Sequence, residues 1–240
     1  MFTSKSKLVV AAAVIASVVG SASASTVDLT YLSVNPGLAE LVSTDSGANF
    51  KTQNAGQFNF SATNKTGATS AVIPGPTVAT WCIELAQDAS INPFTYTVLG
   101  QGFGPFVSPF TNTSAVSAFF NQFFSPSFTT DQATAFQLDI WELELDTTPS
   151  SLSTGTFRVS GNDTAVQQAN AWLTAFNPST VGPWVVFQLH NDSVQDQVFA
   201  LQGGGQGNNP TPLPAGVVGG AALLVGLAMM RRLRRVPVEA

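Results

Sequence analysis

The feature that most restricts the fold is a helical pattern over residues 131–146, in a chain whose other patterned segments are short. Its apolar residues recur at helical spacing and form one stripe: Ala133, Phe136, Ile140 and Trp141. Asp131, or Thr130 before it, is predicted to cap the first turn, because a short oxygen side chain accepts a hydrogen bond from a free backbone N–H. Residues 142–146 could instead switch to a strand.

Gln137 falls inside this apolar stripe, one turn before Trp141. A buried carboxamide without partners costs roughly 1–3 kcal/mol, so its hydrogen bonds must be made inside the protein. The usual solution is a bond to a backbone group. The alternative is a chemical role for the carboxamide, which the residues on other segments must support.

Most of the remaining chain alternates polar and apolar residues, as strands do. Short strands are predicted at residues 26–34, 57–61, 78–85, 96–99, 156–159, 184–189 and 197–201. Helices are predicted at 114–124 and at 165–176, the latter capped by Asn162 or Asp163, while 37–47, 63–75 and 100–109 are turn-rich. This order predicts an α+β fold, a β-rich sandwich or barrel with inserted helices.

Residues 1–24 have the three parts of a signal peptide. Lys5 and Lys7 precede an apolar run over 8–19, and Ala22-Ser23-Ala24 is a small-x-small cleavage site. We therefore expect an exported protein whose ectodomain spans residues 25–202.

The C-terminal end carries a second apolar segment. Residues 203–214 form a Gly/Asn/Pro linker that ends in Pro212, Leu213 and Pro214. Residues 215–230 are apolar, and four arginines follow: Arg231, Arg232, Arg234 and Arg235. We expect 215–235 to be a transmembrane helix whose arginines lie on the cytoplasmic side.

Charge and composition between these ends exclude several classes of function. Residues 25–210 contain three bases and thirteen acids, a net charge of about −10. Nucleic acid is not an expected partner, because phosphate contacts need Lys and Arg. Cys82 is the single cysteine and His190 the single histidine, so neither an internal disulfide nor a Cys/His zinc site is expected. No cofactor is predicted, and His190 is interpreted as a loop residue.

Carboxylates in and after the central helix leave two alternatives open. Asp139, Glu142, Glu144 and Asp146 could bind calcium, but they lack the order of an EF-hand loop, and a solvated face is the preferred interpretation. A glycosidase pair such as Glu84 with Glu142 is conceivable, although no spacing singles it out.

Cys82 lies in the strand predicted at 78–85. Strict alternation puts it on the face opposite Trp81 and Ile83, which favours the Trp81 face as core, although both faces could be covered. The simplest interpretation of Cys82 is a small buried hydrophobe.

The C-terminal segment from Thr211 to Arg235 resembles the PEP-CTERM sorting signals of Gram-negative bacteria, in the variant with Pro-Leu-Pro-Ala. The resemblance implies recognition and cleavage by an exosortase-type membrane protease. It also implies a transient anchor in the inner membrane and a final location at the cell surface or in the extracellular matrix.

The ectodomain also resembles a family of exported PEP-CTERM proteins and, through them, the thioester domains of bacterial surface adhesins. The matching segments are residues 81–85 (Trp-Cys-Ile-Glu-Leu), 135–142 (Ala-Phe-Gln-Leu-Asp-Ile-Trp-Glu), 169–173 and 195–197. The resemblance implies that Cys82 and Gln137 form an internal thioester. Asp139 stands where the family usually has Ala.

The chemistry requires these residue types. A cysteine thiolate held against a glutamine carboxamide can displace ammonia, and proximity can supply effective molarities of about 10⁵–10⁸ M. Trp81, Phe136 and Trp141 are predicted to shield the bond from water. A partner amine or hydroxyl would then attack the Gln137 carbonyl, making this a single-use covalent adhesion module rather than a turnover enzyme. The alternative is a non-catalytic structural or matrix protein associated with exopolysaccharide.

Overall fold

The computed structural model describes residues 24–203 except 147 and 150, and in this range it is an α+β protein, as predicted. The strands are β1 (Thr26–Ser43), β2 (Lys51–Thr63), β3 (Thr77–Cys82), β4 (Phe94–Gly100), β5 (Arg158–Ser160), β6 (Trp184–His190) and β7 (Gln197–Gln202). The helices are α1 (Thr69–Val72), α2 (Thr113–Phe123), α3 (Thr130–Leu145) and α4 (Thr164–Ala175).

The strand pairings close on themselves. Going round the sheet, β1 pairs with β2, β2 with β3, β3 with β7, β7 with β6, β6 with β4, and β4 again with β1, all antiparallel. Six strands therefore form a closed ring, and the short β5 pairs with the far end of β1 at residues 41–43. Closure leaves those six strands paired on both sides over part of their length, which reduces exposed sheet edges.

The turn predicted at residues 37–47 is largely wrong. β1 continues through Pro36 and Gly37 to Ser43, with a register shift between Val34 and Gly37, and the chain reverses only at residues 44–50. Gly37 pairs with Gly56 of β2, and a Cβ on Gly56 would lie 2.5 Å from the Gly37 Cα. The glycines are needed because the two backbones approach too closely for side chains, not because the chain turns there.

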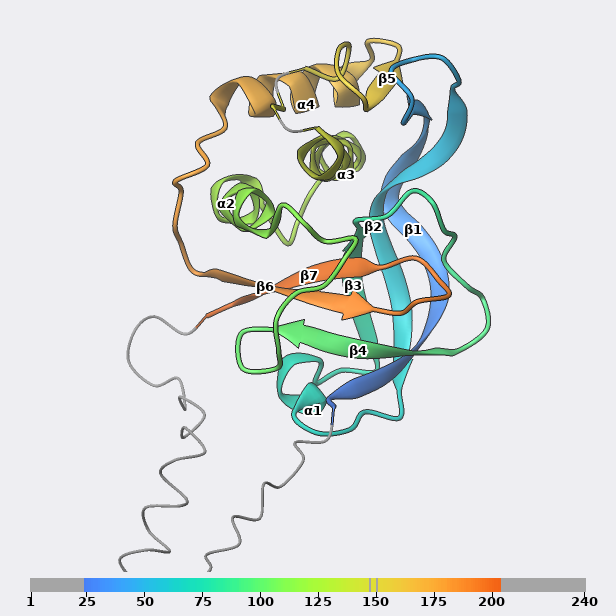
Figure 1. Ribbon diagram of the computed structural model, residues 1–240, viewed down its shortest axis with the longest axis vertical. Coiled ribbons are helices and arrows are strands. Elements are labelled where there is room, and N and C mark those ends of the chain that lie inside the picture. Colours follow the sequence, from blue (N-terminus) through green and yellow to red (C-terminus); the bar gives the residue numbers. More distant parts are fainter. Residues whose placement is uncertain (1–23, 147, 150, 204–240) are drawn as a thin grey trace, which may run out of the picture.

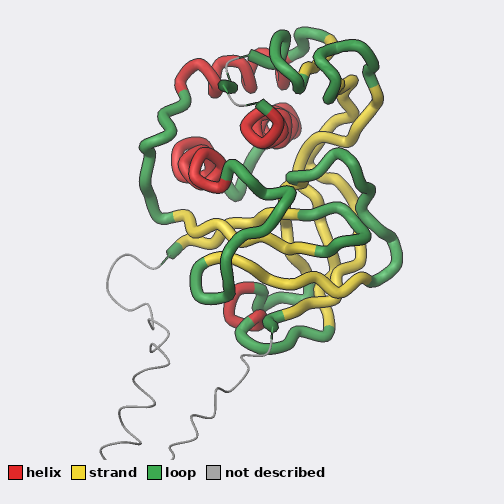
Figure 2. The backbone as a smooth tube through the Cα atoms, viewed as in Figure 1, coloured by secondary structure: helices red, strands yellow, loops and turns green. Residues whose placement is uncertain are grey.

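The helices α2, α3 and α4 lie together on one side of the strands, with α4 outermost (Figure 1). Figure 2 shows the same separation, with α1 alone at the opposite end of the strands. Helix α3 lies between the strands and α4, and it contacts β1, β2 and β3 as well as α2 and α4. It is therefore the central element of the domain.

Helix α3 differs from its predicted form in three ways. Every residue from Ala133 to Leu143 is buried, so the helix is covered all round rather than along one stripe. Residues 142–145 remain helical instead of forming a strand. The cap is Thr129, whose side chain accepts from the Gln132 N–H while the Gln132 side chain accepts from the Thr129 N–H.

Strand β3 divides the core in two. Cys82 packs in a large cluster inside the ring with Leu138 and Trp141, whereas Trp81 and Ile83 pack in a second, phenylalanine-rich cluster with α2. Both faces of β3 are therefore covered, the alternative that strand alternation had left open.

The predicted signal peptide and the sorting segment lie outside the described residues, apart from Ala24 and Gly203. Within the described part of the chain, no helix is both long and apolar enough to cross a membrane.

Candidate functional site

Cys82 and Gln137 meet in the buried core, although 55 residues separate them in the sequence. The Cys82 N–H donates to Gln137 Oε1 at 2.9 Å, and Gln137 Nε2 donates to the Cys82 carbonyl at 2.7 Å. Both residues have zero exposed surface. The Gln137 carboxamide is thus held by two hydrogen bonds against the main chain of the one cysteine.

Local structure explains this meeting. Cys82 is the last residue of β3, and its position opposite Gln197 of β7 ends the short β3–β7 ladder. The Cys82 N–H and carbonyl on the side of α3 need partners, because buried backbone groups are almost always paired. Gln137, in the middle of α3, supplies both a donor and an acceptor for them.

The Cys82 thiol has its own contacts. Its Sγ–H donates to the Glu84 carbonyl at 2.9 Å, and Sγ accepts from Trp141 Nε1 at 3.4 Å and from the Glu84 N–H at 3.3 Å. Burial raises the pKa of the Cys82 thiol to about 12, only partly offset by the hydrogen bonds from Trp141 and the Glu84 backbone. The thiol is therefore protonated at neutral pH and is not a preformed thiolate.

The three aromatic residues predicted as shields occupy two different places. The Trp141 indole contacts the Cys82 sulfur directly. Trp81 and Phe136 instead pack on each other in the second cluster, with ring centroids 4.7 Å apart. Of these three, Trp141 is the one whose contact with the sulfur the structure shows, whereas Trp81 and Phe136 belong to the second cluster.

Further polar side chains surround Cys82 inside the ring. Gln195 Nε2 donates at 2.9 Å to the Glu84 carbonyl that also receives the Cys82 thiol proton. Gln197 Nε2 donates to Gln195 Oε1 at 3.0 Å, and the Thr80 hydroxyl donates to Gln197 Oε1 at 2.9 Å. Sequence reasoning gave Thr80 no role and treated Gln195 and Gln197 only as marks of the resemblance. Their signal was an i, i+2 pair of glutamines at the start of an otherwise apolar strand.

His190 is not the loop residue that the sequence suggested. It ends β6, and its Nδ1 lies 2.8 Å from Oδ2 of the fully buried Asp196. Burial alone would lower the pKa of His190, but the hydrogen bond and charge of Asp196 raise it overall. Asp196 also accepts from Gln188 Nε2 and from the Asn191 N–H, so this carboxylate organises the β6–β7 turn.

The solvated face predicted for four carboxylates is also wrong. Asp139 and Glu142 are 0 % and 1 % exposed, because α3 is covered on all sides. Glu144 accepts from the Thr111 and Asn112 N–H groups, and Asp146 from those of Thr156 and Phe157, so these two carboxylates fix neighbouring loops. In the described part of the chain, no group of three or more Asp, Glu, His or Cys side chains is placed to hold a metal ion.

Asp139 is the exception among these carboxylates. Neither of its side-chain oxygens has a hydrogen-bond partner. Burial, together with the charge of Glu142, raises the pKa of Asp139 well above its ordinary value. Asp139 is therefore expected to keep its proton to a higher pH than a free aspartate and to be a source of instability when it ionises.

Comparison with known proteins adds no identification, since no family model, curated protein or solved structure matches the chain. The two resemblances stated above remain predictions.

Proposed function

We propose that this protein is an exported cell-surface protein, sorted by a PEP-CTERM-like tail, whose Cys82–Gln137 pair forms an internal thioester that captures a partner amine or hydroxyl. The observation that carries the proposal is the pair of hydrogen bonds between the Gln137 carboxamide and the Cys82 main chain. They hold the carbonyl carbon to be attacked beside the residue that bears the nucleophile, in a site without exposed surface.

The hydrogen bonds also suit the reaction. When sulfur adds to the Gln137 carbonyl carbon, negative charge develops on Oε1, and the Cys82 N–H already donates to that atom. The C–S bond forms as the C–N bond breaks, and the thiol proton leaves with the amide nitrogen as ammonia. When the thioester captures a partner amine or hydroxyl, a C–N or C–O bond forms, the C–S bond breaks, and the sulfur regains a proton.

Burial of the Cys82 thiol makes the thioester slow to form but protects it from hydrolysis once it has formed. Few molecules carry a thiolate at neutral pH, so formation depends on proton transfer from sulfur during the attack. The same burial excludes water from the product. We therefore expect a bond that forms once after folding, and no turnover.

The structural alternative rests on a specific observation. The Gln137 carboxamide is already satisfied by main-chain groups, which accounts for a buried glutamine without any reaction. In that case Cys82 is a packing residue of a matrix protein associated with exopolysaccharide. Export and sorting are common to both proposals, with Pro212–Pro214 and the arginines after residue 230 as the segment for an exosortase-type protease.

Mass spectrometry of the full chain, purified in its folded form, separates the two proposals. A thioester predicts a mass lower by one ammonia, a cross-linked peptide joining Cys82 to Gln137, and a thiol that becomes titratable only after methylamine opens the bond. A mass without this deficit, with no methylamine uptake, would exclude the thioester.

Two substitutions of Gln137 separate chemistry from structure. Gln137→Glu keeps the shape and, when protonated, both hydrogen bonds, so the protein should fold but take up no methylamine. Gln137→Ala leaves two buried backbone groups unpaired and should lose roughly 2–5 kcal/mol of unfolding free energy. Cys82→Ala keeps the Gln137 bonds and should abolish uptake with a much smaller loss. Methylamine uptake by either Gln137→Glu or Cys82→Ala would mean that another residue carries the reaction.

A further inference from the structure

A hollow of about 260 Å³ lies over the candidate site. Its lining comes from the β1–β2 hairpin, the loop after β3, helix α3 and the turn before β7, and includes Tyr31, Gln53, Asn54, Asp88, Trp141 and Gln195. Two of these residues belong to the surroundings of Cys82. Trp141 donates to the Cys82 sulfur, and Gln195 donates to the Glu84 carbonyl that receives the thiol proton. The hollow is therefore the recess that adjoins this buried site.

The polar lining is mostly carboxamide. Gln53 and Asn54 can each donate and accept, which matches a hydroxyl group, since a hydroxyl also does both. The Gln195 carboxamide is already bonded within the protein, to two backbone carbonyls and to Gln197. Asp88 adds a carboxylate to this lining, which can accept from a hydroxyl and also attracts an ammonium group, so binding of spermidine is the competing outcome. No Lys, Arg or His is among the described residues lining this hollow, so it has no positive charge to attract a phosphate or carboxylate.

The apolar lining is aromatic. Tyr31 is half-buried, and its ring is braced by Phe58 and Phe60, with centroids 6.2 Å and 5.9 Å away. A fixed aromatic ring beside hydrogen-bonding amides suits a ligand with one apolar face and a polar rim. A pyranose ring has this form, because its C–H groups make a flat apolar face and its hydroxyls lie around the edge.

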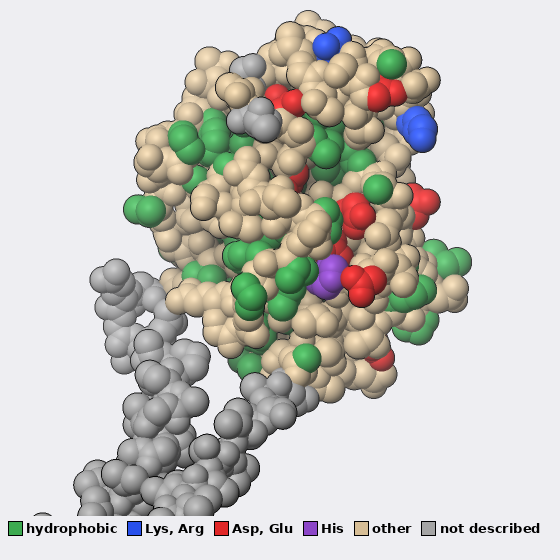
Figure 3. Space-filling model, viewed as in Figure 1, with side chains coloured by type: hydrophobic (Ala, Val, Ile, Leu, Met, Phe, Trp, Pro, Cys, Tyr) green, Lys and Arg blue, Asp and Glu red, His purple; other side chains and the backbone are tan. Residues whose placement is uncertain are grey.

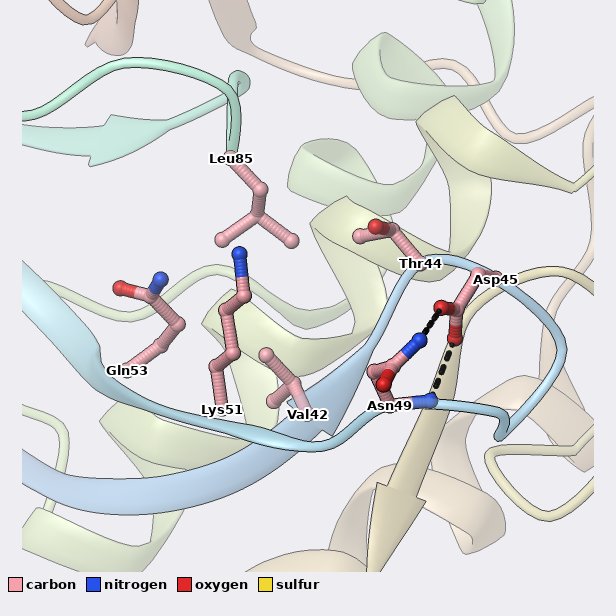
Figure 4. A pocket seen from close by; sticks show the side chains of 7 residues that line it. All are labelled: Val42, Thr44, Asp45, Asn49, Lys51, Gln53 and Leu85. Atoms are coloured by element: carbon pink, nitrogen blue, oxygen red, sulfur yellow. Dashed lines mark hydrogen bonds between the residues drawn. The ribbon is translucent and has the colours of Figure 1, made fainter.

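A second hollow of about 310 Å³ adjoins the first, since Gln53 lines both. Figure 4 shows Lys51 and Gln53 rising from β2 side by side, facing Leu85 across the hollow. Asn49 and Asp45 lie at its other end and bond to each other at 2.6 Å. The two hollows together leave room for more than one sugar unit along β2.

We propose that these adjoining hollows bind a saccharide chain, with one neutral sugar ring against Tyr31 and its hydroxyls on Gln53 and Asn54. The bound chain continues toward Lys51. This recognition is non-covalent and does not require the thioester, so it goes beyond the function proposed above. It gives either kind of surface protein a ligand of the type present in a polysaccharide matrix.

Titration calorimetry and saturation-transfer NMR with cellopentaose, maltopentaose and xylopentaose test the proposal on the folded full chain. At least one of these sugars should bind, and Tyr31→Ala should weaken binding at least tenfold. Because Tyr31 also packs on Phe58, Gln53→Ala and Asn54→Ala provide variants with less risk to folding, each expected to weaken binding several-fold. Phe50→Ala is the matched control: Phe50 is an exposed aromatic residue in the turn of the same hairpin, and it does not line either hollow.

Cys82→Ala distinguishes this proposal from the covalent one. It should bind the sugar as the unchanged protein does, even if it has lost methylamine uptake. Loss of sugar binding in Cys82→Ala would contradict a separate non-covalent site. The proposal would also be overturned if none of the three sugars bound, if Tyr31→Ala and Gln53→Ala both bound normally, or if spermidine bound in place of the sugars.

Discussion

At the scale of single residues, the site is defined by which buried polar groups have partners. Gln137 is fully satisfied by Cys82, and Gln195 and Gln197 are satisfied by each other and by the Glu84 carbonyl. Such networks are stable only when each member is paired, since an unpaired buried group loses its water without replacement. Asp139, two residues from Gln137, violates this rule.

Asp139→Ala is therefore expected to stabilise the protein. The substitution removes two unpaired buried oxygens, and we expect a gain of roughly 1–3 kcal/mol at neutral pH, reduced by any cavity left behind. Urea unfolding at pH 7.5 measures the change.

Asp192→Ala is the matched control, because the Asp192 side chain is 95 % exposed, and its ion pair with His190 lies at the surface, where such pairs affect stability little. A loss of stability in Asp139→Ala, unlike in this control, would show that the Asp139 carboxylate has a favourable role in the core.

At the scale of elements, acidic groups meet where β1, α3 and α4 come together. Glu40 of β1 is 5 % exposed, and its pKa is raised to about 7 by burial first, then by Asp163 and Asp131. Asp163 is the N-cap of α4 and accepts from the Val166 N–H at 3.0 Å. The same carboxylate thus stabilises one helix and repels the neighbouring strand.

Two substitutions of Asp163 separate these effects. Asn is an equally good cap, so Asp163→Asn should keep α4 and remove the repulsion, raising stability at pH 7.5 by roughly 1 kcal/mol. Asp163→Ala should lose the cap at a cost of about 1 kcal/mol, offset by removal of the same repulsion with Glu40.

Thermal unfolding of both variants at pH 5 and pH 7.5 checks this. Protonated Glu40 feels little repulsion at pH 5, so the gain from Asp163→Asn should shrink there. An equal gain at both pH values would rule out Glu40 as the cause.

At the scale of the whole molecule, burial raises the pKa of several carboxyl groups at once. Glu40, Asp139, Glu144 and Asp196 all have raised pKa values with burial as the largest cause. Most of the described acids remain at the surface, and Figure 3 shows red acidic groups spread over one face with few blue bases. The protein thus combines an acidic surface with an acidic interior.

The pH dependence of stability follows from these shifts. A carboxyl with a raised folded pKa keeps its proton when the unfolded chain has lost it, so stability is full below the unfolded pKa and falls as pH rises through the folded pKa. For Glu40 this window runs from 4.5 to about 7. The raised pKa of His190 acts in the same direction above its ordinary value of 6.5.

We therefore expect the highest melting temperature near pH 5 and a fall of about 5–10 °C by pH 8, measured by calorimetry at constant ionic strength. On the acid side, hydrogen bonds from Ser43 and Asn49 lower the pKa of Asp45 to about 2. The stability that ionised Asp45 contributes is therefore lost only as the pH falls well below 4. A melting temperature that rises from pH 5 to pH 8 would contradict the assignment of raised carboxyl pKa values.

The sequence by itself determined the elements that local patterns control. Alternation located the strands, and helical spacing located α2, α3 and α4, because these features depend on near neighbours in the chain. Asp163 was one of two residues predicted to cap α4. The resemblance singled out Cys82 and Gln137, which the fold brings together, but neither spacing nor composition could show that Gln137 would bond the Cys82 main chain.

Only the tertiary structure decided what depends on distant contacts. Close packing of Gly37 on Gly56 allows β1 to continue as a strand where the sequence predicted a turn-rich segment. Layers on both sides of α3 buried Asp139 and Glu142, which the sequence analysis interpreted as part of a solvated face. Ring closure placed Gln195, Gln197 and the Tyr31 hollow beside Cys82. Burial and pairing are properties of the assembled layers, so no local pattern in the chain records them.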